Sequence, residues 1–250
     1  MNIYNFYNNI GWEKGNKISK DAELFEDLRQ CAKIYVSKCR KKINKFIPRK
    51  GSHILDFASG PIQYREYLAY SKNFKIRHCV DFSKSAIKEA KKKIGKKGKF
   101  YSKNFFNIKF KENFFDCVVS LHTLYHIPKK EQKKAVIKLI KITKKNKPII
   151  IVYSNPKTLI SRIKNIFFKN KRKQKIYFFC HPIDWWHQFS NIADVKITNW
   201  RAFSSQHQKI LFPDNFIGEI MFKILFFLED IFKNFFSKNF QYPIIILKKK

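Results

Sequence analysis

Two short segments in the first half of the chain carry residues that could bind a nucleotide-like ligand. Ala58, Ser59 and Gly60 follow the apolar run HILDF, and Asp81 follows a second apolar run, HCV. Small residues after a strand let the backbone approach a ligand closely, and an acid at the end of the next strand can accept hydrogen bonds from both hydroxyls of a ribose. Each feature also has a plain alternative, because the loop alone could be an ordinary turn and the acid a helix cap.

A second candidate for chemistry is the histidine pair in the segment SLHTLYHIP. An unperturbed imidazole titrates near pH 6.5, so His122 could take a proton from a hydroxyl or amine near neutral pH. We predict that His122 is the catalytic base, held in one tautomer by Ser120 and Thr123. The alternative is that it packs under the following helix. No metal site is predicted, because no third ligand lies near His122 and His126 in the sequence.

Alternating strands and helices are predicted to position these residues. The expected strands cover residues 53–57, 76–82, 99–103, 115–121 and 148–153, and the helices between them cover residues 61–70, 83–94 and 128–143. This alternation is typical of parallel strands joined by right-handed crossovers, with helices on both faces of the sheet. Ligands of such sheets bind at the carboxyl ends of the strands, which is where both groups of candidate residues fall.

The ends of the chain add further predicted elements. Steps of three and four between apolar residues predict one long helix over residues 22–47, capped by Ser19 or Asp21, after an irregular arm over residues 1–18. Tyr7 and Trp12 on this arm either form a lid over the ligand or anchor a loose terminus. Two late strands are expected over residues 195–200 and 243–247, separated by a Phe-rich helical insertion at about 206–240.

In this order, five segments of the chain resemble the successive motifs of class I S-adenosylmethionine-dependent methyltransferases, of the type 11-like domain. They are HILDFASGPIQYREYL, HCVDFSKSAIKEAKKKI, FYSKNFFNIKF, FFDCVVSLHTLYHIP and IIIVYSNP, within about residues 50–154. The resemblance implies an α/β fold with a doubly wound, mostly parallel seven-stranded sheet, Rossmann-like, to which the late strands supply an antiparallel pair. We therefore expect an N-terminal arm and cap helix over residues 1–48 and a methyltransferase domain over residues 49–250.

The resemblance also implies S-adenosyl-L-methionine as the cofactor and gives individual residues a place around it. Its expected contacts are the acid closing the first strand, the small-residue loop, the ribose acid and its neighbour, the adenine pair and the end of the fourth strand: Asp56, Ala58, Ser59, Gly60, Asp81, Phe82, Asn104, Phe105 and Leu121. The family loop has three glycines, D-x-G-x-G-x-G, and this chain keeps only the middle one. Asn104 stands where the family usually has an acid, and its amide oxygen can still accept a hydrogen bond.

The formal net charge of +35 invites the hypothesis of a polyanionic partner. Of the 53 basic residues, however, 45 are lysine and only 8 are arginine. Phosphate recognition more often uses the arginine fork, and an excess of Lys, Ile, Asn and Phe is what A+T-rich codons encode. We therefore expect weak, salt-sensitive attraction to anionic polymers and membranes, and no specific nucleic-acid partner.

The acceptor is expected to be a small molecule, a sugar or a lipid, methylated by in-line transfer. No N/D-P-P-Y motif follows the fourth strand, and no RNA-binding module is visible. Two alternatives stay open: a non-catalytic cofactor-binding or membrane-associated protein of the same fold, and an RNA methyltransferase supported only by the net charge. The amphipathic stretch Ile217–Phe236 either covers the sheet or acceptor cavity, or lies on a membrane surface, as a weak peripheral association.

The compartment is predicted from what the sequence does not contain. Neither a secretory signal nor a stretch of about 18 uninterrupted apolar residues is visible. The cysteines are odd in number, scattered, and form no CxxC pair: Cys31, Cys39, Cys79, Cys117 and Cys180. This pattern is typical of a reducing compartment, and we expect a cytoplasmic protein.

Overall fold

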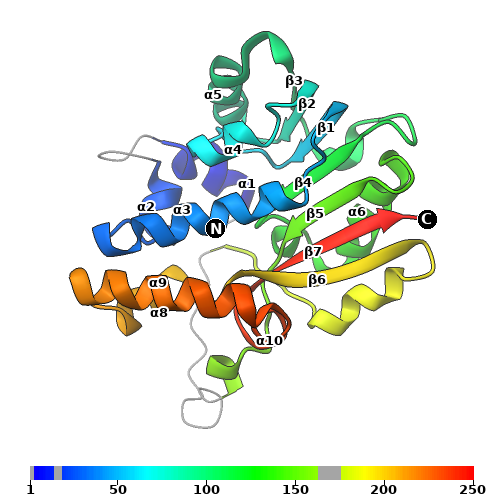
Figure 1. The fold of residues 1–250 in the computed structure, drawn as a ribbon. Helices are drawn as coiled ribbons and strands as arrows, with labels where there is room; N and C mark the ends of the chain where they lie inside the picture. Colours follow the sequence, from blue (N-terminus) through cyan, green and yellow to red (C-terminus); the bar gives the residue numbers. More distant parts are fainter. Residues whose placement is uncertain (1–2, 14–18, 163–175) are drawn as a thin grey trace.

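The computed structural model describes residues 3–13, 19–162 and 176–250, and a seven-stranded sheet runs through its centre (Figure 1). The strands are β1 (Gly51–Phe57), β2 (Phe74–Asp81), β3 (Gly98–Ser102), β4 (Cys117–Leu121), β5 (Pro148–Val152), β6 (Ala193–Arg201) and β7 (Tyr242–Lys249). Their order is β3-β2-β1-β4-β5-β7-β6; the first five are parallel, and β7 runs antiparallel to both β5 and β6. The predicted α/β fold class, with its doubly wound and mostly parallel sheet, is confirmed.

Branched apolar side chains explain why the central strands form where they do. All five residues of β5 are buried, and Ile149 and Ile151 pack on one face of the sheet while Ile150 packs on the other. A strand covered on both faces needs a continuous apolar run, which is the pattern seen in the sequence. The fourth strand begins later than predicted, at Cys117, because Phe115 forms only an isolated bridge with Thr143.

Helices cover both faces of the sheet. One face carries α3 (Lys33–Lys41), α4 (Arg65–Ala69), α5 (Lys84–Ile94), α9 (Phe216–Ile231) and α10 (Lys233–Asn239). The other face carries α6 (Lys129–Ile142) and the 3₁₀ helix η7 (Ile183–Phe189). Ser83 caps α5, since its hydroxyl accepts a hydrogen bond from the backbone N–H of Ala86.

The long helix predicted over residues 22–47 is wrong, because the chain breaks it at residues 26–29. The observed elements are α2 (Lys20–Phe25), the 3₁₀ turn η2 (Gln30–Ala32), α3 and the 3₁₀ turn η3 (Lys42–Lys45). At the break, an oxygen of Asp27 accepts a hydrogen bond from the backbone N–H of Arg29, and the Arg29 guanidinium donates to the carbonyl of Phe212. The hydrogen bond between Asp27 and Arg29 competes with the backbone bonds of a helix, and the contact of Arg29 with Phe212 stabilises the break.

Two other predicted segments differ in detail. The arm is not wholly irregular, since α1 (Ile3–Phe6) and the π-helical turn η1 (Tyr7–Gly11) form within it; its residues 1–2 and 14–18 lie outside the described part. The helix expected over residues 61–70 shortens to α4, because Ile62 has a φ of 51°, which is incompatible with a right-handed helix. The Ser19 side chain caps α2 by accepting a hydrogen bond from the backbone N–H of Ala22, so Asp21 is not the cap of this helix.

The Phe-rich insertion between β6 and β7 is helical, as predicted. It consists of α8 (Ser205–Leu211), α9 and α10, and α9 lies alongside α3 at the edge of the molecule (Figure 1). The fully buried Glu229 fixes α9 in place: its carboxylate pairs with Lys42 (2.6 Å) and accepts hydrogen bonds from the Tyr35 hydroxyl (2.6 Å) and the Ala202 N–H (2.7 Å). A buried carboxylate with three partners orients the helix.

Candidate active site

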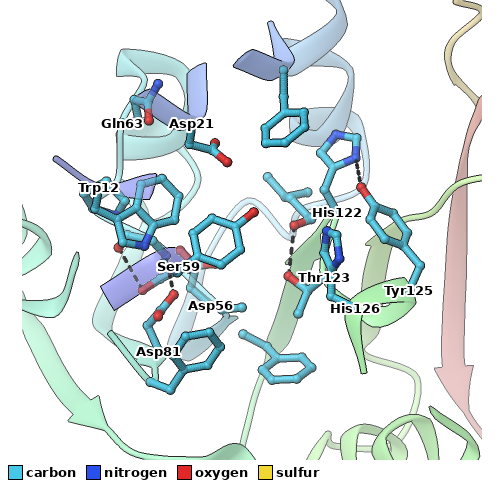
Figure 2. A pocket seen from close by; sticks show the side chains of 18 of the residues that line it. Trp12, Asp21, Asp56, Ser59, Gln63, Asp81, His122, Thr123, Tyr125 and His126 are labelled. Atoms are coloured by element: carbon cyan, nitrogen blue, oxygen red, sulfur yellow. Dashed lines mark hydrogen bonds between the residues drawn. The ribbon is translucent and has the colours of Figure 1, made fainter. Parts of the chain in front are cut away.

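A cavity of about 1270 Å³ opens at the carboxyl ends of the parallel strands (Figure 2). It is larger than the 300–1,000 Å³ or so of a typical small-molecule site, so two ligands can share it. All ten residues predicted to be catalytic or cofactor-binding line this one cavity: Asp56, Ala58, Ser59, Gly60, Asp81, Phe82, Asn104, Phe105, Leu121 and His122. Figure 2 shows Asp56, Ser59 and Asp81 on one side of it and His122, Tyr125 and His126 on the other.

The loop after β1 has an unusual backbone. Ala58, Gly60 and Ile62 have φ values of 56°, 56° and 51°, so every second residue is left-handed. These are the three positions at which the resembled loop carries glycine. The Ser59 N–H donates to the carbonyl of Val80 (3.1 Å) and the Gly60 N–H to the Asp81 carboxylate (3.0 Å). The loop is therefore tied to the end of β2, and its turns leave backbone close to the cavity.

Two backbone N–H groups hold the carboxylate of Asp81 in place. Its two carboxylate oxygens accept hydrogen bonds from the N–H groups of Gly60 (3.0 Å) and Ser83 (2.9 Å). Burial raises the pKa of Asp81 to about 6, although these backbone N–H groups oppose the shift. At neutral pH the group is therefore an anchored carboxylate, with lone pairs left over for ligand hydroxyls.

Asp56, the acid that closes β1, has a different environment. It pairs with Nη2 of Arg77, and both side chains are buried. Nη1 of Arg77 donates to the carbonyl of Tyr67 (2.6 Å), which fixes the guanidinium under the loop. The Asp56 charge is thus neutralised within the protein, and this acid supports the loop as well as lining the cavity.

The adenine end of the predicted site is built by a short turn after β3. The Asn104 side chain accepts a hydrogen bond from the N–H of Phe106 (3.0 Å) and so caps the 3₁₀ turn η5 (Phe105–Asn107). Phe105 is buried, with its ring centroid 4.3 Å from that of Phe57. The amide group of Asn104 is exposed at the cavity wall, so it keeps an N–H₂ donor and a second oxygen lone pair for a ligand.

The N-terminal arm lies over the loop. Tyr7 and Trp12 line the cavity with stacked rings whose centroids are 5.0 Å apart. The indole sits so close to Gly60 that a Cβ there would be 3.1 Å from it. Both rings are therefore part of the cavity wall, which is the position that a lid over the ligand requires.

Asp21 is a site residue that the sequence reasoning missed, because it was considered only as a helix cap. Its carboxylate lines the cavity and accepts a hydrogen bond from the Tyr7 hydroxyl. Burial raises the pKa of Asp21 to about 7, so the group titrates near neutral pH. Next to it, the Ser19 hydroxyl donates to Oε1 of Gln63 (2.6 Å), which joins the start of α2 to the loop.

His122 stands at the end of β4 with a φ of 56° and faces the other half of the cavity. Its Nδ1 lies 2.9 Å from the Tyr125 hydroxyl, and its ring packs against Trp200 and Tyr242, with centroids 4.7 Å and 5.1 Å away. Burial, followed by the positive charge of Arg201, holds the pKa of His122 well below its usual value. The imidazole is therefore neutral at physiological pH.

The prediction that Ser120 and Thr123 orient this ring is wrong. The Thr123 hydroxyl donates to the carbonyl of Leu121 (3.0 Å), and the buried Ser120 hydroxyl has no hydrogen-bond partner among the described residues. Tyr125 takes that role, because the turn after β4 (η6, Leu124–His126) brings it back under the ring. His126 is held separately, since its Nδ1 donates to the carbonyl of Tyr177 (2.9 Å).

Two arginines, Arg40 and Arg201, lie close enough to His122 for their charges to act on it. Glu26 accepts from Nη1 of Arg201 at 3.2 Å and pairs with Nη2 of Arg40 at 3.6 Å. Two nearly buried guanidiniums thus share one carboxylate, and Nε of Arg201 has no partner within the described part of the chain. The scarcity of arginine could have pointed to this cluster: in a chain with 45 lysines and 8 arginines, Arg29, Arg40, Arg77 and Arg201 each pair with a carboxylate.

Neither a metal-binding cluster nor a membrane-spanning helix is found in the part of the chain that the structure describes. Residues 3–13, 19–162 and 176–250 contain no group of three or more His, Cys, Asp or Glu side chains that could hold a metal ion. Within the same residues, no helix is both long and apolar enough to cross a membrane.

Comparisons with known proteins agree with the fold. Residues 55–151 match the family described as a methyltransferase domain. Magnesium protoporphyrin IX methyltransferase from Synechocystis PCC 6803, solved with bound S-adenosylhomocysteine, has a TM-score of 0.61 at 13% identity, over 99% of this chain and 98% of that one. A SAM-dependent methyltransferase from Archaeoglobus fulgidus has a TM-score of 0.54 at 20% identity, over 87% and 94% of the two chains. A search of curated proteins gives no match.

Proposed function

Since the chain is a class I S-adenosylmethionine-dependent methyltransferase, we propose that it methylates a small-molecule, sugar or lipid acceptor held in the same cavity as the cofactor. The observation that carries this proposal is the single cavity of about 1270 Å³, with an anchored acid at one end and a neutral histidine at the other. A ligand pair bound there would be shielded from water by the arm that carries Tyr7 and Trp12.

The residues of the first half suit the cofactor. We assign the ribose hydroxyls to the Asp81 carboxylate, the methionyl part to the loop of Ala58, Ser59 and Gly60, and the adenine to the turn at Asn104. Asp56 supports the loop, and the remaining predicted contacts, Phe82, Phe105 and Leu121, supply apolar wall. The donor set fits such a molecule, because Asp81 is ionised at neutral pH and the backbone of the loop is close to the cavity.

The second half suits the acceptor. When bound, the cofactor supplies a methyl group already activated by a sulfonium, so the protein mainly has to align the acceptor and remove its proton. We assign proton removal to Nε2 of His122. This requires Nδ1 to carry a proton and donate it in a hydrogen bond to the Tyr125 hydroxyl oxygen, 2.9 Å away. The acceptor O–H or N–H proton then passes to Nε2 as the new bond to the methyl carbon forms.

The charged side chains beside His122 indicate what kind of acceptor fits the cavity. The cluster of Arg40, Arg201 and Glu26 carries one more positive than negative charge, and Arg201 lines the cavity. A guanidinium at the cavity wall, in a cluster with surplus positive charge, favours a ligand that brings an anionic or strongly polar oxygen. We therefore favour acceptors with a carboxylate or phosphate near the methylated atom.

Two measurements test the proposal. Calorimetry should detect binding of S-adenosylhomocysteine to the full-length protein; no heat at millimolar ligand would refute the assignment of the cofactor half. Methyl-labelled S-adenosylmethionine should then be incubated with the protein and separate small-molecule, lipid, sugar and RNA fractions of a cell extract. Label in one of the first three fractions is expected, whereas label confined to RNA would refute the acceptor class.

A further inference from the structure

Helix α9 is apolar around most of its circumference, yet only one side of it is buried. The buried side carries Gly218, Phe222, Leu225 and Glu229, spaced by three or four residues, and packs against α3 and the sheet. The charged side chains of α9 lie on one flank, where Lys223 pairs with Glu219 (3.0 Å) and Asp230 pairs with Lys45 and Lys233; the positions opposite the buried side are apolar. The exposed apolar side chains of α9 are Phe216, Ile217, Ile220, Met221, Ile224, Phe227, Leu228 and Ile231. A helix that is apolar on nearly all sides is normally covered on nearly all sides.

The exposed side chains are large and continue beyond α9. Phe216 is 72% exposed, Phe227 63% and Ile224 53%, and further exposed apolar residues precede and follow the helix at Ile210 and Phe235. Soluble proteins rarely leave apolar patches of this extent uncovered, and those that do use them for binding. We refer to the exposed apolar side chains of residues 210–235 as the α9 face.

The α9 face adjoins the segment that borders the cavity. The Ser205 hydroxyl at the start of α8 donates to the carbonyl of Phe25 (2.6 Å), which joins α8 to the end of α2. Leu24 and Phe25 are each about half exposed and also line the cavity. A second exposed apolar pair, at the rim of the site, is therefore joined to the insertion that carries the α9 face through α8.

The charges around the α9 face indicate what covers it. Helix α3 lies beside α9, and its exposed lysines include Lys33, Lys38 and Lys41; no acid occurs anywhere from Lys33 to Lys45. The Lys38 ammonium lies 5.2 Å from the ring centroid of Phe226 on α9. An apolar centre bordered by lysines is typical of a surface that lies on anionic lipid. A second copy of the chain fits less well, since each copy carries a net charge of +35.

We propose that the α9 face docks on the surface of an anionic lipid bilayer. The apolar side chains of α9 enter the boundary between headgroups and acyl chains, and the lysines of α3 pair with the anionic headgroups. Helix α9 has 16 residues, fewer than the 20 or so needed to span a bilayer, so it lies in the plane of the interface. Docking in this way brings the cavity rim at Leu24 and Phe25 to the bilayer, which, if the proposed function holds, favours an amphiphilic acceptor.

Binding of the full-length protein to vesicles tests the docking without cofactor or acceptor. The vesicles are phosphatidylcholine alone or phosphatidylcholine with one part in four of phosphatidylglycerol, and bound protein is measured by flotation. We expect the wild type to bind the anionic vesicles, to bind the neutral ones much less, and to be released in part by high salt. Ile224→Glu and Phe227→Glu should each lower binding on the order of tenfold or more.

The matched control is Ile192→Glu. Ile192 is 44% exposed, similar to Ile224, and lies at the opposite end of β6 from α8. This variant should bind the vesicles like the wild type, and calorimetry with S-adenosylhomocysteine in the absence of vesicles checks that all three variants are folded. A wild-type protein that binds S-adenosylhomocysteine but does not bind the anionic vesicles would overturn the docking and leave the proposed function standing. A lipid-free dimer that Ile224→Glu dissociates, with no vesicle binding, would assign the α9 face to a second copy instead.

Discussion

The two halves of the cavity are built in different ways. In the cofactor half, consecutive strand–loop–helix units bring Gly60 and Asp81 together, and backbone N–H groups hold the acid. In the acceptor half, the wall consists of side chains from segments far apart in the sequence, including Glu26, His122 and Arg201. A site made by backbone at strand ends depends on local sequence, whereas a site made by side chains depends on how the whole chain packs.

The halves also differ in how burial acts on their titratable groups. Burial raises the pKa of Asp81 to about 6, but backbone hydrogen bonds keep it ionised at neutral pH. Burial and the Arg201 charge lower the pKa of His122 well below its usual value, so it stays neutral. One half therefore presents a fixed negative charge, and the other an uncharged group that can accept a proton.

The largest expected effect is on turnover in the acceptor half. His122→Ala should lower the turnover rate by about 10²–10⁴-fold and leave the affinity for S-adenosylhomocysteine nearly unchanged, because the side chain is assigned to the acceptor alone. Single-turnover kinetics and calorimetry measure the two quantities separately. Tyr125→Phe, which removes only the hydroxyl beside Nδ1, should have a smaller effect on the rate. A folded His122→Ala protein that no longer binds the cofactor would place His122 in the other half.

The next effect in size is on binding in the cofactor half. Asp81→Ala removes the acceptor of the ribose hydroxyls and should weaken S-adenosylhomocysteine binding by about 1–3 kcal/mol, or roughly 5–150-fold. The control is Asp184→Ala, since Asp184 is an exposed acid on η7. Calorimetry on both variants separates the loss of a contact from the loss of one negative charge. Equal affinities for the two variants would contradict the ribose assignment.

The contrast between the halves also explains what the sequence could predict. The ends of β1 and β2 were found because apolar runs, small residues and an acid follow one another within a short stretch, and Ser83 marks the next helix start. The break between α2 and α3 was missed because its stabilising bonds run from Arg29 to the carbonyls of Gln208 and Phe212, on a segment far along the chain. No periodicity in residues 22–47 reports such a partner.

The acceptor half was predicted only in part for the same reason. His122 was found from its place after a strand, but its partner was wrongly predicted, because a tight turn rather than sequence adjacency brings Tyr125 to the ring. Asp21 was taken for a cap, since the sequence does not show that α2 directs its carboxylate into the cavity. The amphipathic pattern of residues 217–236 likewise does not show whether another surface covers the α9 face.

A smaller effect is expected from pH. In the proposed assignment the carboxylate form of Asp81 accepts the ribose hydrogen bonds, and burial raises the pKa of this group to about 6. Affinity for S-adenosylhomocysteine should therefore be nearly constant above pH 7 and fall as pH drops through about 6, by about tenfold per pH unit at most. The free protein has the opposite preference: a pKa raised from 3.8 means that protonation favours the folded state, so this group's contribution to stability declines as pH rises from about 4 to 6.

Calorimetry between pH 5 and pH 8 checks the binding curve, with Asp81→Asn as the control. The amide does not titrate, so the variant should bind weakly but with a flatter pH profile. Asp21, whose pKa is raised to about 7, is the other titrating acid of the cavity, and Asp21→Asn shows its share. A wild-type profile that is flat from pH 5 to pH 8 would contradict an Asp81 carboxylate that titrates in this range and binds the ribose.

The smallest effect concerns the backbone on which the cofactor half depends. Ala58 has a φ of 56°, a conformation that costs a non-glycine residue about 1–2 kcal/mol. Ala58→Gly should relieve this strain, while the added freedom of glycine in the unfolded chain costs about 0.4–1 kcal/mol, so the free energy of unfolding should rise by about 0.5–1 kcal/mol. The matched control is Ala69→Gly in the exposed, right-handed helix α4, where the same change should lower it by about 0.5–1 kcal/mol. Urea denaturation measures both, and a loss of stability in both variants would mean that Ala58 is not strained.

Ile62 shares the left-handed backbone but is fully buried against Cys79 and Ile87, so Ile62→Gly should destabilise the protein through lost packing.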